Sequence, residues 1–152
     1  MEAGQKLVLV LPRKSPLVEL ANNPGVLGVL GVDAGPSDLS ELLKEDPENT
    51  VIVVDDFDTL TNDHQINPRI EEHIKTCRDH HGGVLVACGI DEIGGMYRGV
   101  VATAKKTRTG LVLAPRSSDD GSHFSVRLRT ALYSRSTKIG RHCGIYRCGA
   151  CS

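Results

Sequence analysis

The chain has 152 residues, of which 39% are hydrophobic but only 3% aromatic, and its formal net charge at pH 7 is -1. This length fits one domain with its own core. Because the core must be built from Val, Leu, Ile and Ala, the composition favours an α/β protein with a parallel sheet. A net charge near zero means that no overall basic field favours the binding of nucleic acid. The first residues, MEAGQKLVLVLPRK, have neither the basic leader of a signal peptide nor an apolar stretch long enough to span a membrane, so we expect a cytoplasmic chain without a membrane span.

Three elements are expected in the first 32 residues. The continuous apolar run 6–11 predicts a buried strand. Ser15 and Pro16 are typical of the cap and first position of a helix, which Asn23-Pro24-Gly25 would end. The glycine-rich segment 26–32 fits either a short strand or a loop.

The middle of the chain predicts two helices on either side of a strand. Ser37 would cap the first helix and Pro47 would end it, and the run 51–54 has the clearest strand pattern in the sequence. Asn67 would cap the second helix, and Gly82-Gly83 would end it. One face of that helix carries apolar residues at helical spacing, namely Ile70, Ile74 and Cys77.

The remaining pattern is weaker. Residues 84–88 and 111–114 predict strands, and between them 91–110 predicts a helix weakened by Gly94 and Gly95. Residues 124–128 alternate like a short edge strand. Strands that alternate with helices predict a parallel sheet covered on both faces, whose ligands lie at the carboxyl ends of the strands.

Two acids, Asp55 and Asp56, follow the strand 51–54 directly. In nucleotide-hydrolysing α/β domains an acid at this place holds Mg²⁺, and a second acid beside it can orient the attacking water. An acidic loop after a strand, without a bound metal, has the same sequence pattern, so both interpretations stay open. The motif G-x-x-x-x-G-K-[ST], whose backbone and lysine hold the phosphates, does not occur in the 152 residues. We therefore do not expect this chain alone to hydrolyse ATP.

Four segments carry a resemblance to a known family: KLVLVLPRKSPL, VIVVDDFDTL, GGVLVACGIDE and YRGVVATAKKTRTGLVLAPRSSDDG, followed by VRL. In this order they resemble the carboxyl-terminal part of FtsK/SpoIIIE-type ATPase domains, and especially the degenerate ATPase domains of the type VII secretion proteins EccC and EssC. The match covers roughly residues 5–130. Its most specific part is RTGLVLAPRSSDDG, at the expected distance after the acid pair.

The resemblance implies a RecA-like three-layer fold with a mostly parallel sheet in residues 1–133. The Arg-, Ser- and Cys-rich composition that follows favours a disordered tail over 134–152. The second to fifth strands of that fold would be 6–11, 51–55, 84–88 and 111–114. Its first strand and phosphate loop would lie upstream of Met1. Because that first strand lies between the fourth and fifth, its absence would leave a gap in the sheet.

The resemblance also implies a multi-domain or hexameric motor that moves DNA or a secreted protein with ATP and Mg²⁺. The partners would be the rest of a larger ATPase or a homo-oligomeric ring, held at the inner face of a membrane by upstream segments. Asp55 would bind Mg²⁺ and, with Asp56, complete the nucleotide site, and Arg116 would act as the arginine finger.

Two departures from the family pattern favour a silent docking module over an active motor. The family usually has Asp-Glu where this chain has Asp55-Asp56. Its fourth strand usually ends near a polar sensor residue, whereas this one ends at Ala87-Cys88-Gly89. The motor, the docking module and an unrelated α/β domain with an acidic strand end all remain open.

Three other clusters have a functional and a structural interpretation. The basic residues Arg98, Lys105, Lys106 and Arg108 fit an arginine finger, a DNA channel or a solvated helix face. The group Cys77, Asp79, His80 and His81 fits a metal site or, better, a helix end at which the histidines interact with the dipole. The tail residues His142, Cys143, Cys148 and Cys151 have enough donors for one zinc ion, or belong to an extension foreign to the domain.

Overall fold

The computed structural model describes residues 4–61, 63–107, 109–113 and 115–128, and the backbone of 143–144. The chain divides into two compact units, Met1–Thr103 and Ala104–Ser152. Among the described residues, no helix combines the length and the apolar composition that a bilayer crossing requires.

The first unit alternates strands with helices, as the sequence predicts. Its strands are β1 (Lys6–Val10), β2 (Val26–Leu30), β3 (Thr50–Val54) and β4 (Gly83–Val86). Its α-helices are α1 (Pro36–Leu43), α2 (Asn67–Thr76), α3 (Ile90–Ile93) and the first part of α4 (Gly99–Lys106). Short 3₁₀ helices complete it: η1 (Pro16–Asn22), η2 (Pro47–Asn49), η3 (Phe57–Thr59) and η4 (Cys77–Asp79).

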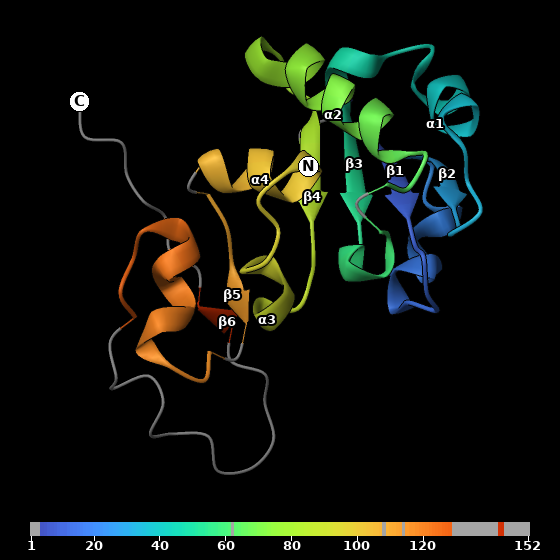
Figure 1. Ribbon diagram of the computed structural model, residues 1–152. Coiled ribbons are helices and arrows are strands. Elements are labelled where there is room, and N and C mark those ends of the chain that lie inside the picture. Colours follow the sequence, from blue (N-terminus) through green and yellow to red (C-terminus); the bar gives the residue numbers. More distant parts are fainter. Residues whose placement is uncertain (1–3, 62, 108, 114, 129–142, 145–152) are drawn as a thin grey trace. The chain divides into compact units, whose positions relative to one another are not determined.

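The four strands form one parallel sheet in the order β2-β1-β3-β4 (Figure 1). The chain leaves β1 toward β2, then returns past β1 to β3 and continues outward to β4. The order therefore reverses between β1 and β3, and the carboxyl ends of these two strands meet at a topological switch point.

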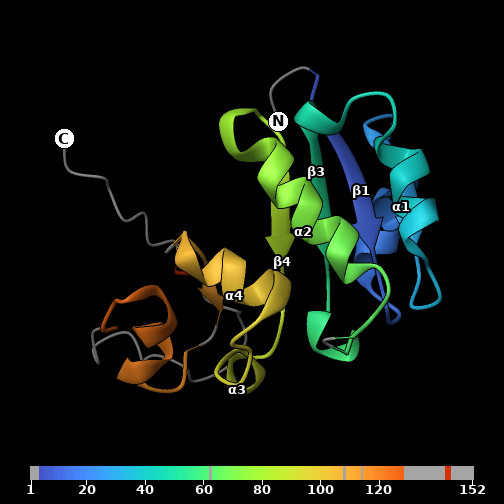
Figure 2. The ribbon, with the colours of Figure 1, turned by 45° about the horizontal axis from the view of Figure 1, so that its top comes forward.

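One face of the sheet carries the main core. Alternate residues of the two central strands, Val8, Val10, Ile52 and Val54, pack with Leu39 and Leu43 of α1, Ile70 of α2 and Val100 and Val101 of α4. Figure 2 shows α2 lying across the strands near β3 and β4, with α1 beside β1. The periods of two on the strands and of three to four on the helices match the buried side chains, so the apolar pattern accounts for this layer.

The opposite face of the sheet is covered unevenly. Registered neighbours place Val29, Leu9, Val53 and Leu85 in one row across β2, β1, β3 and β4. η1 contacts β1 and β2, and the right-handed crossover from β1 to β2 places it on this face. Leu9 is accordingly only 1% exposed, whereas Leu85 is 61% exposed.

The second unit contains little regular structure. Its elements are β5 (Val112–Leu113), the 3₁₀ helix η5 (Ser118–Phe124) and β6 (Cys143–Gly144), in addition to the end of α4. β5 pairs antiparallel with β6 in a separate two-stranded sheet. The expected fifth strand is thus present as two residues outside the parallel sheet.

Several predicted boundaries are corrected by local geometry. The cap of α1 is Gly35 and not Ser37, and this helix ends at Leu43, before Pro47. The cap of α2 is Ile66, so that Asn67 is its first residue. The helix predicted over 91–110 is interrupted between α3 and α4, and Gly99, the first residue of α4, has a positive φ of 78°.

Two further predictions are resolved by the structure. The segment 26–32, which fits a strand or a loop, contains β2. No strand forms over 124–128: Phe124 ends η5, and Ser125 adopts the left-handed conformation, which breaks the alternation.

Candidate functional site

The candidate site lies at the carboxyl edge of the sheet, where β1 and β3 end side by side. Asp55 follows β3 directly, and its backbone N–H still donates to Val10 O on β1 over 3.0 Å. The backbone of Asp55 therefore lies at the switch point, as the strand pattern predicts.

The Asp55 carboxylate accepts hydrogen bonds from its own chain on both oxygens. Ser15 Oγ donates to Asp55 Oδ2 over 2.6 Å, and the N–H of Asp56 donates to Asp55 Oδ1 over 3.1 Å. These contacts orient the carboxylate and satisfy part of its acceptor capacity without a cation.

Ser15 reaches Asp55 because it caps η1. Its backbone is extended, and its hydroxyl accepts from Leu17 N–H over 3.1 Å while it donates to Asp55. The side chain is only 6% exposed. The sequence predicts the capping role but not the contact with Asp55, since that contact depends on β1 and β3 being neighbours. The only signal is that both residues follow apolar strands.

Asp56 is held by backbone geometry. Its φ and ψ are 47° and 48°, a left-handed conformation that Asp tolerates better than most residues. Its carbonyl accepts from Thr59 N–H over 2.9 Å, and the N–H of Phe57 donates to Ala87 O over 2.9 Å. Within the described part of the chain, no hydrogen bond or ion pair engages the Asp56 carboxylate. It is therefore the more available of the two acids.

The residues at this edge offer carboxylate oxygens but no assembled metal or nucleotide site within the described part of the chain. Carboxylate oxygens are the ligands that Mg²⁺ prefers, and Asp55 and Asp56 supply them. The turn from β1 to η1 offers little to phosphates: Pro12 and Pro16 have no N–H, and the Leu17 N–H is already bonded to Ser15. Among the described residues, no group of three or more His, Cys, Asp or Glu side chains is arranged to hold a metal.

The third predicted catalytic residue, Arg116, belongs to the second unit. Its backbone N–H donates to Asp120 Oδ2 over 2.6 Å, and Ser117 contributes its N–H and hydroxyl to the same carboxylate. These hydrogen bonds, first that from Arg116, lower the pKa of Asp120. They form a capping box at the start of η5, and a role of Arg116 toward Asp55 stays a prediction.

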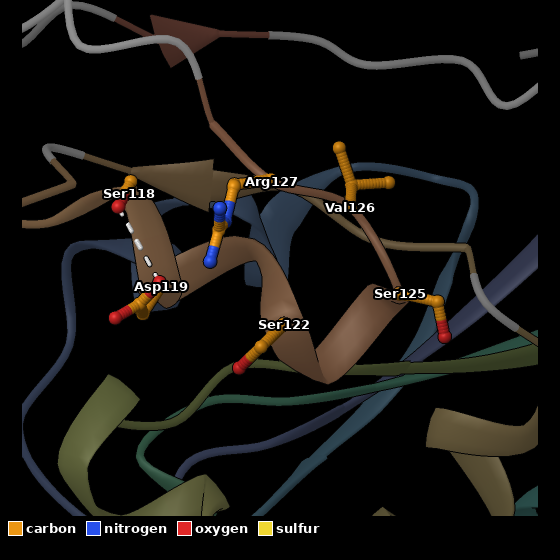
Figure 3. A pocket seen from close by; sticks show the side chains of 6 residues that line it. All are labelled: Ser118, Asp119, Ser122, Ser125, Val126 and Arg127. Carbon is orange, nitrogen blue, oxygen red and sulfur yellow. Dashed lines mark hydrogen bonds between the residues drawn. The ribbon is translucent and has the colours of Figure 1, made fainter.

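The second unit also has an open cavity of about 310 Å³. Figure 3 shows its lining, which consists of Ser118, Asp119, Ser122, Ser125, Val126 and Arg127. Ser118 Oγ donates to Asp119 Oδ1 over 3.3 Å. One acid and one base balance each other, so the lining does not favour a ligand of either charge.

A buried histidine that sequence analysis missed lies at the other end of the sheet. His73 on α2 is fully buried, and its Nε2 lies 2.9 Å from Thr50 O and 3.3 Å from Cys77 Sγ. Burial lowers the pKa of His73 and raises that of the Cys77 thiol, to which Glu48 adds. These shifts keep both the His73 imidazole and the Cys77 thiol neutral. We therefore interpret the pair as a core contact and not as an activated nucleophile.

The other clusters give no assembled site. Cys77 is buried as predicted, whereas His80 is exposed and pairs with Glu48 through Nδ1 and Oε2 at 3.4 Å. Arg98 and Lys106 are exposed, and Arg108 lies outside the described residues. His142, Cys148 and Cys151 also lie outside them, and only the backbone of Cys143 is described.

No protein-family model and no curated protein matches the chain. Among solved structures, the chain is similar to Thermomonospora curvata EccC, ATPases 2 and 3, in complex with a signal sequence peptide. The TM-score is 0.55 at 18% sequence identity, over 77% of this chain and 25% of the EccC chain. The chain thus spans a quarter of the length of the chain it matches. The parallel sheet, its helices and this similarity confirm the predicted fold, which is that of a RecA-like ATPase domain as found in EccC.

Proposed function

We propose that the chain is a non-hydrolysing module of a larger, secretion-related ATPase of the FtsK/SpoIIIE type, in which the ATPase fold docks a polypeptide. The larger motor would move its cargo, and this chain would contribute a binding surface. Such a module would lie on the cytoplasmic side of a membrane.

The observation that supports the proposal most directly is the hydrogen bonding of the Asp55 carboxylate. This carboxylate, which would bind Mg²⁺ in a working nucleotide site, accepts hydrogen bonds from Ser15 Oγ and from the Asp56 N–H. It is therefore stabilised by groups of its own chain. The phosphate-binding motif G-x-x-x-x-G-K-[ST] does not occur in the 152 residues. The 152 residues keep the acid without this motif, and by themselves they are therefore expected to bind a polypeptide and not to hydrolyse ATP.

A polypeptide cargo is favoured over DNA. The net charge of -1 gives no basic field for a phosphate backbone. The EccC structure contains a signal sequence peptide, which supports a peptide ligand for a protein of the same fold.

Calorimetry with ATP and Mg²⁺, on the chain and on Asp55→Asn, tests the absence of nucleotide binding. We expect no saturable heat from either protein, while circular dichroism shows both to be folded. Saturable binding that Asp55→Asn weakens would contradict the proposal. The substitution is a suitable control because an amide oxygen still accepts from Ser15.

The second candidate is an active ATP-driven translocase, which the pairing of Asp55 and Asp56 at the switch-point edge favours. Asp55 would then bind Mg²⁺, Asp56 would orient water, and Arg116 would serve a neighbouring subunit in a ring. This function requires a phosphate loop from another polypeptide segment, and magnesium-dependent ATP binding in the experiment above would support it.

A further inference from the structure

His64 connects two segments of the chain at the carboxyl edge of the sheet. One segment, 31–35, leads from β2 into α1, and the other, 63–66, leads into α2. The Nε2 atom of His64 lies 2.7 Å from Val32 O, and its Nδ1 atom lies 3.3 Å from the backbone nitrogen of Ile66. Because Ile66 is the cap of α2, the ring bridges the entry of this helix and the segment before α1.

The two partners of the ring determine its tautomer. A carbonyl oxygen can only accept, so Nε2 must carry the hydrogen that it shares with Val32 O. A backbone N–H can only donate, so Nδ1 must present its lone pair to Ile66. The neutral ring with its hydrogen on Nε2 is the one form of histidine that satisfies both partners.

The contacts of His64 lie next to the core. Gln65 Nε2 donates to Ala34 O over 3.5 Å, which adds a second contact between the same two segments. The side chains of Ala34 and Ile66 are both buried in the main core. His64 itself is half-buried, so protons from the solvent can reach its ring.

A proton added to the ring would remove one of its two contacts. Protonation places a hydrogen on Nδ1, which would then oppose the Ile66 N–H instead of accepting from it. Among the described residues, the Ile66 N–H has no other acceptor. The added proton would therefore leave this amide without a partner, whereas the hydrogen bond from Nε2 to Val32 O would remain.

Charged side chains of the surrounding elements do not take part in the bridge. The two segments, η3 and the first turns of α1 and α2 carry Asp33, Asp63, Asp58, Asp38 and Arg69. Asp38 accepts from the Gly35 N–H, and Arg69 pairs with Glu72. No ion pair within the described ranges includes His64. The contact with Ile66 therefore depends on the protonation of the His64 ring itself.

We propose that His64 is a proton-sensitive clasp between the segment before α1 and the entry of α2. The neutral ring holds the two together, and the protonated ring releases the Ile66 amide. Because the segment that contains His64 follows the acid pair and η3 in the chain, acidification would loosen one border of the carboxyl edge. The clasp goes beyond the docking function proposed above and does not depend on which ligand is bound.

Nuclear magnetic resonance of the ¹⁵N-labelled chain tests the clasp between about pH 8 and about pH 5, the range in which histidine ordinarily changes charge. The ring nitrogen shifts of His64 should identify the neutral form with its hydrogen on Nε2 at the higher pH. As these shifts report protonation, the exchange protection of the Ile66 amide should fall about fivefold relative to that of Ile52, the size of one hydrogen bond. Ile52 lies in the centre of the sheet and reports global unfolding, so the ratio excludes the contribution of His73.

His64→Gln supplies an amide that can donate and accept but does not titrate, so we expect its protection ratio to be the same at both ends of the pH range. His81→Gln, at an exposed position, is the matched control and should keep the pH dependence of the parent chain. Three results would overturn the proposal: a neutral ring with its hydrogen on Nδ1, protonation of His64 without a change in the ratio, or the same pH dependence in His64→Gln. A ring that stays neutral down to about pH 5 would overturn it as well. The tautomer and the ratio in the parent chain decide the question even if His64→Gln is less stable.

Discussion

Ser15 donates a hydrogen bond to Asp55 from 40 positions away, over 2.6 Å. The bond joins the loop after β1 to the loop after β3, across the switch point of the sheet. It links helix capping to the acid that in a working nucleotide site would hold the metal.

The first prediction concerns the stability that this contact provides. Ser15→Ala removes the cap of η1 and a donor to a carboxylate, so we expect the free energy of unfolding to fall by about 1–2 kcal/mol. Urea denaturation measures it. Ser37→Ala is the control, because Ser37 is exposed and does not cap α1. An equal loss from both substitutions would show that the loss does not come from the contacts of Ser15 with Leu17 and Asp55.

The second prediction separates the backbone of Asp56 from its charge. A β-branched residue is unfavourable at φ 47°, so Asp56→Val should cost about 1–2 kcal/mol. Asp56→Asn removes the charge but tolerates the conformation, and we expect its stability within about 0.5 kcal/mol of the parent chain. Thermal unfolding of the three proteins makes the comparison. A loss from Asp56→Asn as large as that from Asp56→Val would mean that the carboxylate itself stabilises the loop.

The fold follows from local sequence to a large extent. The strand predicted at 51–54 is Thr50–Val54, and the strands predicted at 6–11 and 84–88 are Lys6–Val10 and Gly83–Val86. Apolar runs of this length, separated by helical periodicity, leave few arrangements other than a parallel sheet. The position of Asp55 and Asp56 follows from the same pattern, because a strand end determines a sheet edge.

What sequence could not predict depends on neighbours in space. The Ser15–Asp55 contact requires the order β1-β3, and His73 is buried because Thr50 O and Cys77 lie beside it. His73 lies three residues after Ile70 and four before Cys77, on the predicted apolar face, and this spacing was the available signal. Gly35 and not Ser37 caps α1 because Pro36 takes the first helical position and Asp38 Oδ2 accepts from the Gly35 N–H over 2.8 Å.

The third prediction is a pH dependence of stability from the buried pair. Burial lowers the pKa of His73, so below the ordinary value of about 6.5 the unfolded chain takes up a proton that the folded chain does not. This contribution is present above that value and is lost as the pH falls. The raised pKa of Cys77 acts in the opposite direction, because above about pH 8.5 the unfolded chain releases the thiol proton first and stability falls again.

The urea concentration at the midpoint of unfolding, measured between about pH 5 and about pH 9, should therefore be highest between the ordinary pKa values of His and Cys, about 6.5 and about 8.5. His73→Gln should remove the part of the loss of stability at low pH that comes from this residue. His81→Gln, at an exposed position, should leave this loss of stability unchanged. An acid decline that is the same in all three proteins would show that His73 is not its source.

The fourth prediction concerns the turn into β4. An added Cβ at Gly82 would lie 2.6 Å from Cys77 Sγ, 2.7 Å from Thr50 O and 2.8 Å from Glu48 O, two of them backbone atoms that cannot move without shifting β3 or η2. Gly82→Ala should therefore destabilise the fold by about 1–3 kcal/mol, as other overpacking substitutions do. Gly83→Ala is the matched control, because an added Cβ there meets nothing within 4 Å, and we expect a change of less than about 0.5 kcal/mol. Because Gly82 N–H also donates to Glu48 O over 2.6 Å, the clash should break that bond, and amide exchange at Gly82 reports its loss. If urea denaturation gave equal stabilities for the two variants, the close approach of this turn to β3 would be refuted, and with it the packing that buries His73.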